Sequence, residues 1–129
     1  PSRGPLSSQR AFPVMLRNAL FRRVQAAAFE RYAELAELDG AQGFGEQRWR
    51  EALDGYFMEH DEIRVDGDAR SAALVELDRS NADAWRFRQV LLDPDDDRDW
   101  GIEGRIDIPA SDEAGEPVVI VERVGPFMG

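Results

Sequence analysis

The chain has 129 residues, of which 43% are hydrophobic, so its composition favours a single folded domain and excludes a disordered chain. It lacks cysteine, which excludes disulfide frameworks, thiolate metal sites and cysteine nucleophiles. All 16 basic residues are arginine, and the net charge of −10 arises in residues 61–129. Such an acidic surface would repel nucleic acid. Only residues 1–33, with six arginines and one acidic residue, could attract it.

The first part of the chain predicts a linker followed by two helices. Residues 1–9 are rich in proline, glycine and serine, which is typical of a linker. Apolar residues then recur at steps of three and four, which predicts one long helix over residues 13–39, ended by the Asp39-Gly40 pair. The same period predicts a second helix over residues 46–59.

After residue 60 the apolar period changes from about 3.6 to 2, which predicts strands joined by short turns. The predicted strands cover residues 70–78, 84–92, 100–108 and 117–124, with a short one at 62–65. Two helices followed by consecutive strands predict an α+β fold in which the helices pack on a curved antiparallel meander of four to five strands. Residues 10–124 would form this domain and residues 125–129 a tail, and the order of elements excludes Rossmann and P-loop folds.

A strand register follows from placing apolar residues of neighbouring strands on one face. This rule sets Leu77 beside Trp85, and Trp85 beside Ile108 on the next strand. The opposite face then carries a row of charged residues directly across three strands: Glu76, Arg86 and Asp107. Such cross-strand pairs are typical of a solvent-exposed sheet face.

The final predicted strand breaks the alternation, because residues 118–121 are all apolar. An edge strand that is apolar on both faces needs a cover. The cover would come from residues 126–128 of the tail or from a second copy of the chain. A homodimerisation module built on this strand is therefore one functional hypothesis.

The single histidine, His60, precedes Asp61 at the end of the second helix. A histidine beside a carboxylate can serve as a general acid or base if it opens into a cavity. The alternative is a structural histidine whose partial positive charge suits the C-terminal end of a helix. No nucleophile accompanies the pair, so the sequence favours the structural interpretation.

Three alternate aspartates, Asp95, Asp97 and Asp99, have the spacing that begins a calcium-binding loop. The sixth position is Trp100 where such loops need glycine, and the twelfth is Ile106 where they need glutamate. The alternative is a solvated acidic hairpin loop. The sequence therefore favours no metal and no cofactor.

Four arginines, Arg17, Arg22, Arg23 and Arg31, lie on the first predicted helix. They could bind the phosphates of RNA or dock on an acidic protein surface. They could equally be the polar side of an amphipathic helix. The sequence leaves these alternatives open.

The sequence resembles a domain of unknown function that ends actinobacterial DEAD/DEAH-box superfamily II RNA helicases. The resemblance covers residues 10–124 and is carried by residues 10–12, 14–23, 53–57, 60–63, 85–90, 93–94, 99–102 and 111–116. It implies that the ATP-hydrolysing motor lies upstream in a longer protein, in accord with the missing initiator methionine, and that this piece docks on the motor or a partner. The family has no assigned active-site residues, so none can be carried over.

The order of helices and strands is also similar to the nuclear transport factor 2/cystatin-like cone. That resemblance implies a pocket at one end of a curved sheet, here near His60, and with it a small-molecule-binding or enzymatic alternative. No apolar run approaches the roughly 20 residues that span a bilayer. We therefore expect no membrane partner and a cytoplasmic location.

Overall fold

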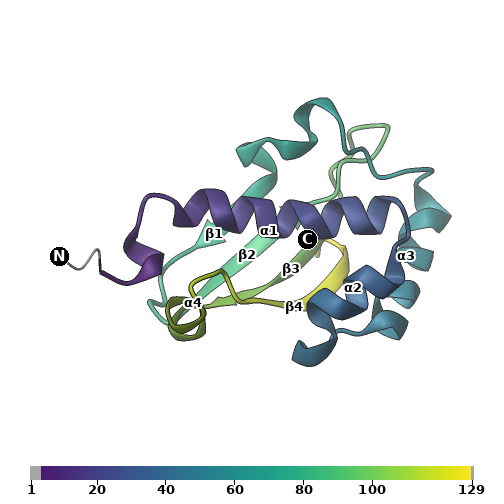
Figure 1. Cartoon of the computed structure of the whole chain (residues 1–129). Coiled ribbons are helices and arrows are strands. Elements are labelled where there is room, and N and C mark those ends of the chain that lie inside the picture. The colour runs from purple at the N-terminus through teal and green to yellow at the C-terminus, as the bar shows by residue number, and fades with distance from the viewer. Residues whose placement is uncertain (1–3, 129) are drawn as a thin grey trace.

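The computed structural model of the chain describes residues 4–128, with helices packed on one four-stranded sheet (Figure 1). The helices are α1 (Phe12–Ala28), α2 (Tyr32–Asp39), α3 (Glu46–Glu59) and α4 (Ile108–Ala114). The strands are β1 (Val75–Asp78), β2 (Ala84–Val90), β3 (Trp100–Asp107) and β4 (Val119–Pro126). They pair antiparallel in the order β1-β2-β3-β4, which confirms the predicted α+β fold and its meander.

The long first helix that the sequence predicts is divided into α1 and α2 at residues 29–31. Glu30 adopts a left-handed conformation with a φ of 53°. The N–H groups of Glu30 and Arg31 donate to the carbonyls of Ala27 and Ala26, at 3.1 and 2.8 Å. This pair of bonds is a Schellman motif with glutamate in the position that usually holds glycine. The chain can therefore turn without a glycine or proline signal.

The Glu30→Gly variant should be more stable than the natural chain. Glycine adopts the left-handed conformation without the penalty of roughly 1–2 kcal/mol that other residues incur, although its extra freedom in the unfolded state offsets part of the gain. We expect a net increase of about 0.5–1 kcal/mol in the free energy of unfolding, measured by urea denaturation. The matched control Glu37→Gly, at an exposed position inside α2, should instead lose about 1 kcal/mol. Equal losses in both variants would contradict the assignment.

One face of the sheet forms the core beneath α1, which crosses the strands in Figure 1. The Phe12 ring meets the Trp85 ring edge to face, with centroids 5.5 Å apart. Leu77 pairs with Phe87, and Trp85 pairs with Ile106. Both registers differ by two residues from the predicted ones, an even number, so the paired apolar side chains still share one face.

The opposite face carries charged rows, as predicted, but with different members. Glu76 pairs with Arg88 and Arg88 with Glu103, while Arg86 pairs with Asp78 and Arg105. Asp107 was expected in such a row. It instead ends β3 opposite Ala84 and is the N-cap of α4, where its side chain accepts the N–H of Ala110 at 3.0 Å.

Three segments differ in kind from the prediction. Residues 111–115 belong mostly to α4 and are not a simple turn, and Gly115 ends that helix with a φ of 74°. The expected strand at residues 70–78 reduces to β1, because two short 3-10 helices, Gly67–Arg70 and Ala72–Leu74, precede it. Residues 62–65 form no strand, although the Arg64 N–H donates to the Leu92 carbonyl at 2.8 Å.

The apolar start of β4 is covered from within the same chain. Val119 and Val121 are buried in the core, and Ile120 is buried as well. α2 and α3 contact β4, and the Arg48 guanidinium of α3 donates to the Glu122 carbonyl at 3.4 Å. The helices thus supply the cover that was expected from the tail or from a second copy.

Part of the segment expected to be a linker folds onto the domain. Residues 1–3 lie outside the described part of the chain, but Leu6–Ser8 form a 3-10 helix. The Ser7 N–H and hydroxyl donate to the Asp112 carboxylate of α4, at 2.8 and 3.1 Å.

Among the described residues, no helix combines the length and the apolar character needed to cross a lipid bilayer.

Candidate functional site

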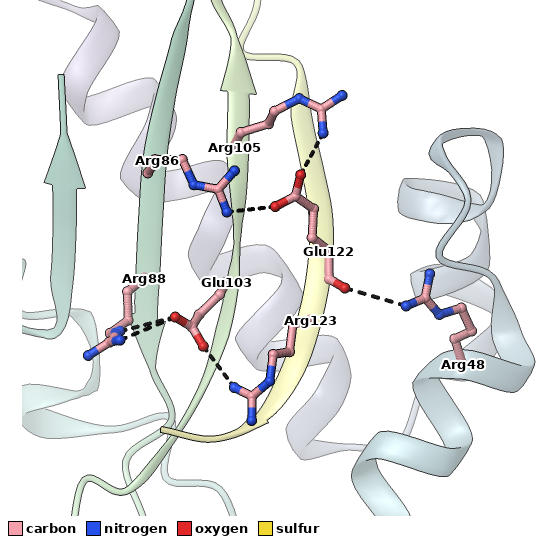
Figure 2. A network of polar contacts seen from close by, with 7 residues as sticks. All are labelled: Arg48, Arg86, Arg88, Glu103, Arg105, Glu122 and Arg123. Carbon is pink, nitrogen blue, oxygen red and sulfur yellow. Dashed lines mark hydrogen bonds and ion pairs between the residues drawn. The ribbon is translucent and has the colours of Figure 1, made fainter. Parts of the chain in front are cut away.

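The charged face of the sheet carries a network of arginines and glutamates in two neighbouring clusters, one around Glu122 and one around Glu103, shown in Figure 2. Glu122 accepts from Arg86 at 2.7 Å and from Arg105 at 2.6 Å. Glu103 likewise accepts from Arg88 at 3.3 Å and from Arg123 at 2.8 Å. Each glutamate therefore holds two arginines from different strands in fixed positions.

A β-bulge in β4 makes this network possible. Glu103 pairs with Arg123, but the next residue, Gly104, pairs with Val121, so Glu122 is an extra residue in the ladder. The bulge interrupts the alternation of faces and lets the neighbours Glu122 and Arg123 both lie on the charged face (Figure 2). A regular strand would direct one of them into the core.

The network is ordered but exposed, since its four arginine side chains are 38–56% exposed. Burial would raise the pKa of the Glu122 carboxyl, but its bonds to Arg86 and Arg105 outweigh burial and hold that pKa below its usual range. Exposed pairs of this kind contribute only about 0–1 kcal/mol each to stability. Their arginines therefore remain available to exchange partners with another charged surface.

A hollow of about 240 Å³ lies at one end of this face, between β1, β2 and β3. Its charged lining consists of Glu76, Asp78, Arg86, Arg88 and Glu103. One of these lining residues, Arg88, also has its guanidinium 4.2 Å from the centre of the Phe127 ring. Arginine and aromatic residues are both enriched in protein-protein interfaces.

The structure removes Arg23 from the predicted group of exposed arginines. Arg23 is buried and forms a two-pronged ion pair with the fully buried Asp39, with Nη2 2.8 Å from Oδ1 and Nε 3.0 Å from the same oxygen. The Trp49 indole N–H also donates to Asp39, at 3.2 Å. These bonds join α1, α2 and α3, so the role of Arg23 is structural.

The other three arginines of that group do not gather into one patch. Arg17 is half-buried, and Arg22 is exposed 3.6 Å from Glu34. These two positions are about 140° apart around α1, at about 100° per residue. Arg31 lies in the break after α1, with its guanidinium 5.1 Å from the centre of the Phe29 ring. A continuous phosphate-binding surface would need them closer together.

The structure brings two separate sequence candidates together beside the end of α3. The buried His60 ring accepts or donates a hydrogen bond at Nε2, 3.0 Å from Asp99 Oδ1. Its Nδ1 lies 3.8 Å from Asp93 Oδ2. Asp61, the expected partner of His60, is exposed instead. The acidic loop after β2 therefore supplies the carboxylates that face the histidine.

Asp93 organises the acidic loop, a role that the sequence analysis missed. Its carboxylate accepts the backbone N–H groups of Asp95, Asp97 and Arg98, at 3.1, 2.9 and 2.8 Å. Burial would raise the pKa of Asp93, but these backbone donors and then His60 hold it below its usual range. The signal was an aspartate directly before proline, a pattern in which the side chain bonds the following backbone.

The three aspartates with the spacing of a calcium loop have three different environments. Asp97 has its carboxylate close to both Asp93 and His60. Desolvation and then the nearby charges of Asp93 and Asp99 raise the pKa of Asp97. Asp99 bonds the far nitrogen of His60, and Asp95 is exposed outside this group. They do not converge as a calcium loop would require.

Two further pockets, of about 560 and 330 Å³, lie beside α1 and α3. Neither they nor the hollow on the sheet include His60 in their linings. The sheet's inner face is filled by large side chains, among them Phe12, Trp85 and Ile106. The arrangement therefore offers surfaces and one histidine–carboxylate cluster, and these three pockets do not form the expected cavity at His60.

The family described as "Domain of unknown function (DUF3516)" matches residues 2–124, nearly the whole chain. No curated protein matches the chain, and no solved structure matches it.

Proposed function

The chain belongs to this family of unknown function, DUF3516, and from that premise we propose that it is a non-catalytic accessory domain of an ATP-dependent DEAD/DEAH-box RNA helicase. In this role it docks on the helicase core of the same polypeptide. The resemblance of residues 10–124 to the end of such helicases motivates the proposal. In this proposal the helicase motor hydrolyses ATP, and the domain contributes a surface that binds the motor.

One observation carries the proposal: the sheet presents an exposed, preorganised network of arginines and glutamates. The Arg86 and Arg105 side chains are held by Glu122 and remain 56% and 41% exposed. Because Glu122 fixes both guanidinium groups, docking would restrict little further side-chain motion. Arginine also forms two-pronged bonds to carboxylates, so an acidic patch on the motor is the fitting partner.

RNA contact through α1 is a weaker proposal, because Arg23 is buried and the remaining arginines are separated. A homodimer through the sheet would compete for the same charged face. A ligand-binding cone would need a pocket at His60. Docking on the motor requires neither a patch of arginines on α1, nor a second copy, nor a pocket at His60. It uses the arginines of the sheet, which Glu103 and Glu122 already hold in place.

The test is carried out with the full-length protein and with this chain added to a parent from which the domain has been deleted. Deletion should change the RNA preference or processivity of unwinding, and the added chain should bind the truncated parent. Arg86→Ala with Arg105→Ala should weaken that binding at least about tenfold, as central interface arginines do. The matched control, Arg50→Ala with Arg64→Ala, removes one exposed and one half-buried arginine outside the sheet and should change affinity less than about twofold. Unchanged unwinding after deletion, or equal effects of both pairs, would contradict docking through this face.

A further inference from the structure

The two ring nitrogens of His60 are used differently. The side chain is 5% exposed, and Nε2 lies at hydrogen-bond distance from Asp99, 3.0 Å. Nδ1 faces Asp93 Oδ2 at 3.8 Å, which is too long for a hydrogen bond. A buried histidine thus directs one nitrogen, without a hydrogen bond, at a buried carboxylate.

The hydrogen bond to Asp99 fixes what Nδ1 can do. When Nε2–H donates to Asp99, the neutral ring keeps its lone pair on Nδ1, facing an oxygen of Asp93. That oxygen, Oδ2, already accepts the backbone N–H groups of Asp95 and Asp97, so it supplies no proton to Nδ1, whose lone pair can act as a metal ligand. A carboxylate on the far nitrogen is also the partner that orients histidine ligands in metal sites.

A third ligand lies close by. One ligand atom each from His60, Asp93 and Asp97 can be chosen so that all lie within 4.8 Å of one another. Ligands at about 2.1 Å from a tetrahedral ion lie about 3.4 Å apart, so the widest separation in the set needs to shrink by up to about 1.4 Å. Asp97 is exposed on the loop and can make most of this movement. Asp93 Oδ2 accepts two backbone N–H groups and Oδ1 accepts one, which leaves about one lone-pair position, on Oδ1, for an ion.

We propose that His60 Nδ1, Asp93 and Asp97 bind a divalent transition-metal ion of the Zn²⁺ type, with Asp99 positioning the His60 ring. One imidazole nitrogen with two carboxylate oxygens suits Zn²⁺, whereas Ca²⁺ takes six to eight oxygen ligands. Three protein ligands leave a fourth position for water or for a group from a partner. The ion connects the end of α3 to the loop between β2 and β3, and it neutralises part of that loop's negative charge.

Calorimetric titration of the chelator-treated chain with Zn²⁺, and separately with Ca²⁺, tests the site. We expect saturable binding of one Zn²⁺ and much weaker binding of Ca²⁺. Asp97→Asn removes an exposed ligand without disturbing the core and should weaken Zn²⁺ binding at least about tenfold. Asp95→Asn is the matched control: it removes the same charge from the same loop outside the ligand group, and its affinity should stay within about threefold.

The single histidine of the chain gives a second readout, because every histidine ¹⁵N signal comes from His60. Zn²⁺ should shift the Nδ1 resonance strongly and leave the proton on Nε2. No saturable binding, equal losses in the two variants, equal affinity for Ca²⁺, or an Nδ1 that carries a proton with Zn²⁺ present would each overturn the site. These measurements use the chain alone, so their outcome is independent of docking on a helicase.

Discussion

The Arg23→Met variant should lose about 3–5 kcal/mol of stability, because the Asp39 carboxylate would stay buried without its cation. Asp39 is fully buried and Arg23 is 6% exposed, so water cannot replace the guanidinium. Urea unfolding followed by far-UV circular dichroism measures the loss. The matched control Arg22→Met changes the adjacent arginine, whose side chain is 62% exposed, and should stay within about 0.5 kcal/mol.

The loss in Arg23→Met should also depend on pH with a defined sign. Burial raises the pKa of Asp39 above 3.8, and the bonds to Arg23 and Trp49 oppose that rise. Without Arg23 the folded-state pKa rises further, so between the ordinary and the raised value the folded chain binds more protons than the unfolded one. Stability then falls as pH rises through this window. The variant should therefore lose more stability at about pH 8 than at about pH 5.

Removing both partners separates charge from packing. In the double variant Arg23→Met/Asp39→Leu no buried charge remains, so it should be more stable than Arg23→Met alone. A loss equal to the sum of the two single losses would show that the residues act independently. If the stability loss of Arg23→Met did not vary with pH, the packing of the arginine side chain, and not its charge, would be what stabilises the fold.

Arg23 also shows what sequence patterning can and cannot identify. It lies seven residues after Leu16 and three after Leu20, so it occupies the apolar stripe of α1 that the period predicts. That position was the available signal for burial. Its partner Asp39 was predicted only as a helix end, because nothing local indicates which acid a buried arginine will meet.

The strands were predicted well in face and poorly in register. Alternating apolar residues determine which side chains share a face, but registers that differ by two residues place the same residues on that face. Turn length decides between them, and the sequence allowed both. The short helix α4 shows a different limit: seven residues are too few for a clear 3.6-residue period, and its signal was Asp107 at the N-cap with Pro109 just inside.

The candidate sites depended on contacts distant in sequence. His60 and the acidic loop were each recognised, but their convergence follows from the position of β3 beside the end of α3. Glu30 could not be recognised as a turn residue, because left-handed glutamate has no sequence signature. The β-bulge that places Glu122 and Arg123 on the same face could likewise not be predicted. The first residues of that strand are all apolar, so its sequence does not show where the alternation of faces is interrupted.

That bulge gives the second large expected effect: Gly104→Ala should destabilise the fold by about 3 kcal/mol. A Cβ at Gly104 would collide with the backbone carbonyl oxygen of Ile120 and would meet the Phe87 ring at 3.0 Å. The carbonyl belongs to the neighbouring strand, so it cannot move away without distorting the β3–β4 ladder.

Gly40→Ala is the matched control, because a Cβ there meets nothing within 4 Å and the backbone is already helical, with φ −59° and ψ −42°. It should be neutral or stabilising by up to about 1 kcal/mol. Thermal unfolding of both variants measures the difference. If Gly104→Ala were as stable as Gly40→Ala, the strands could separate freely at the bulge, and the fixed placement of Glu122 between Arg86 and Arg105 would lose its structural basis.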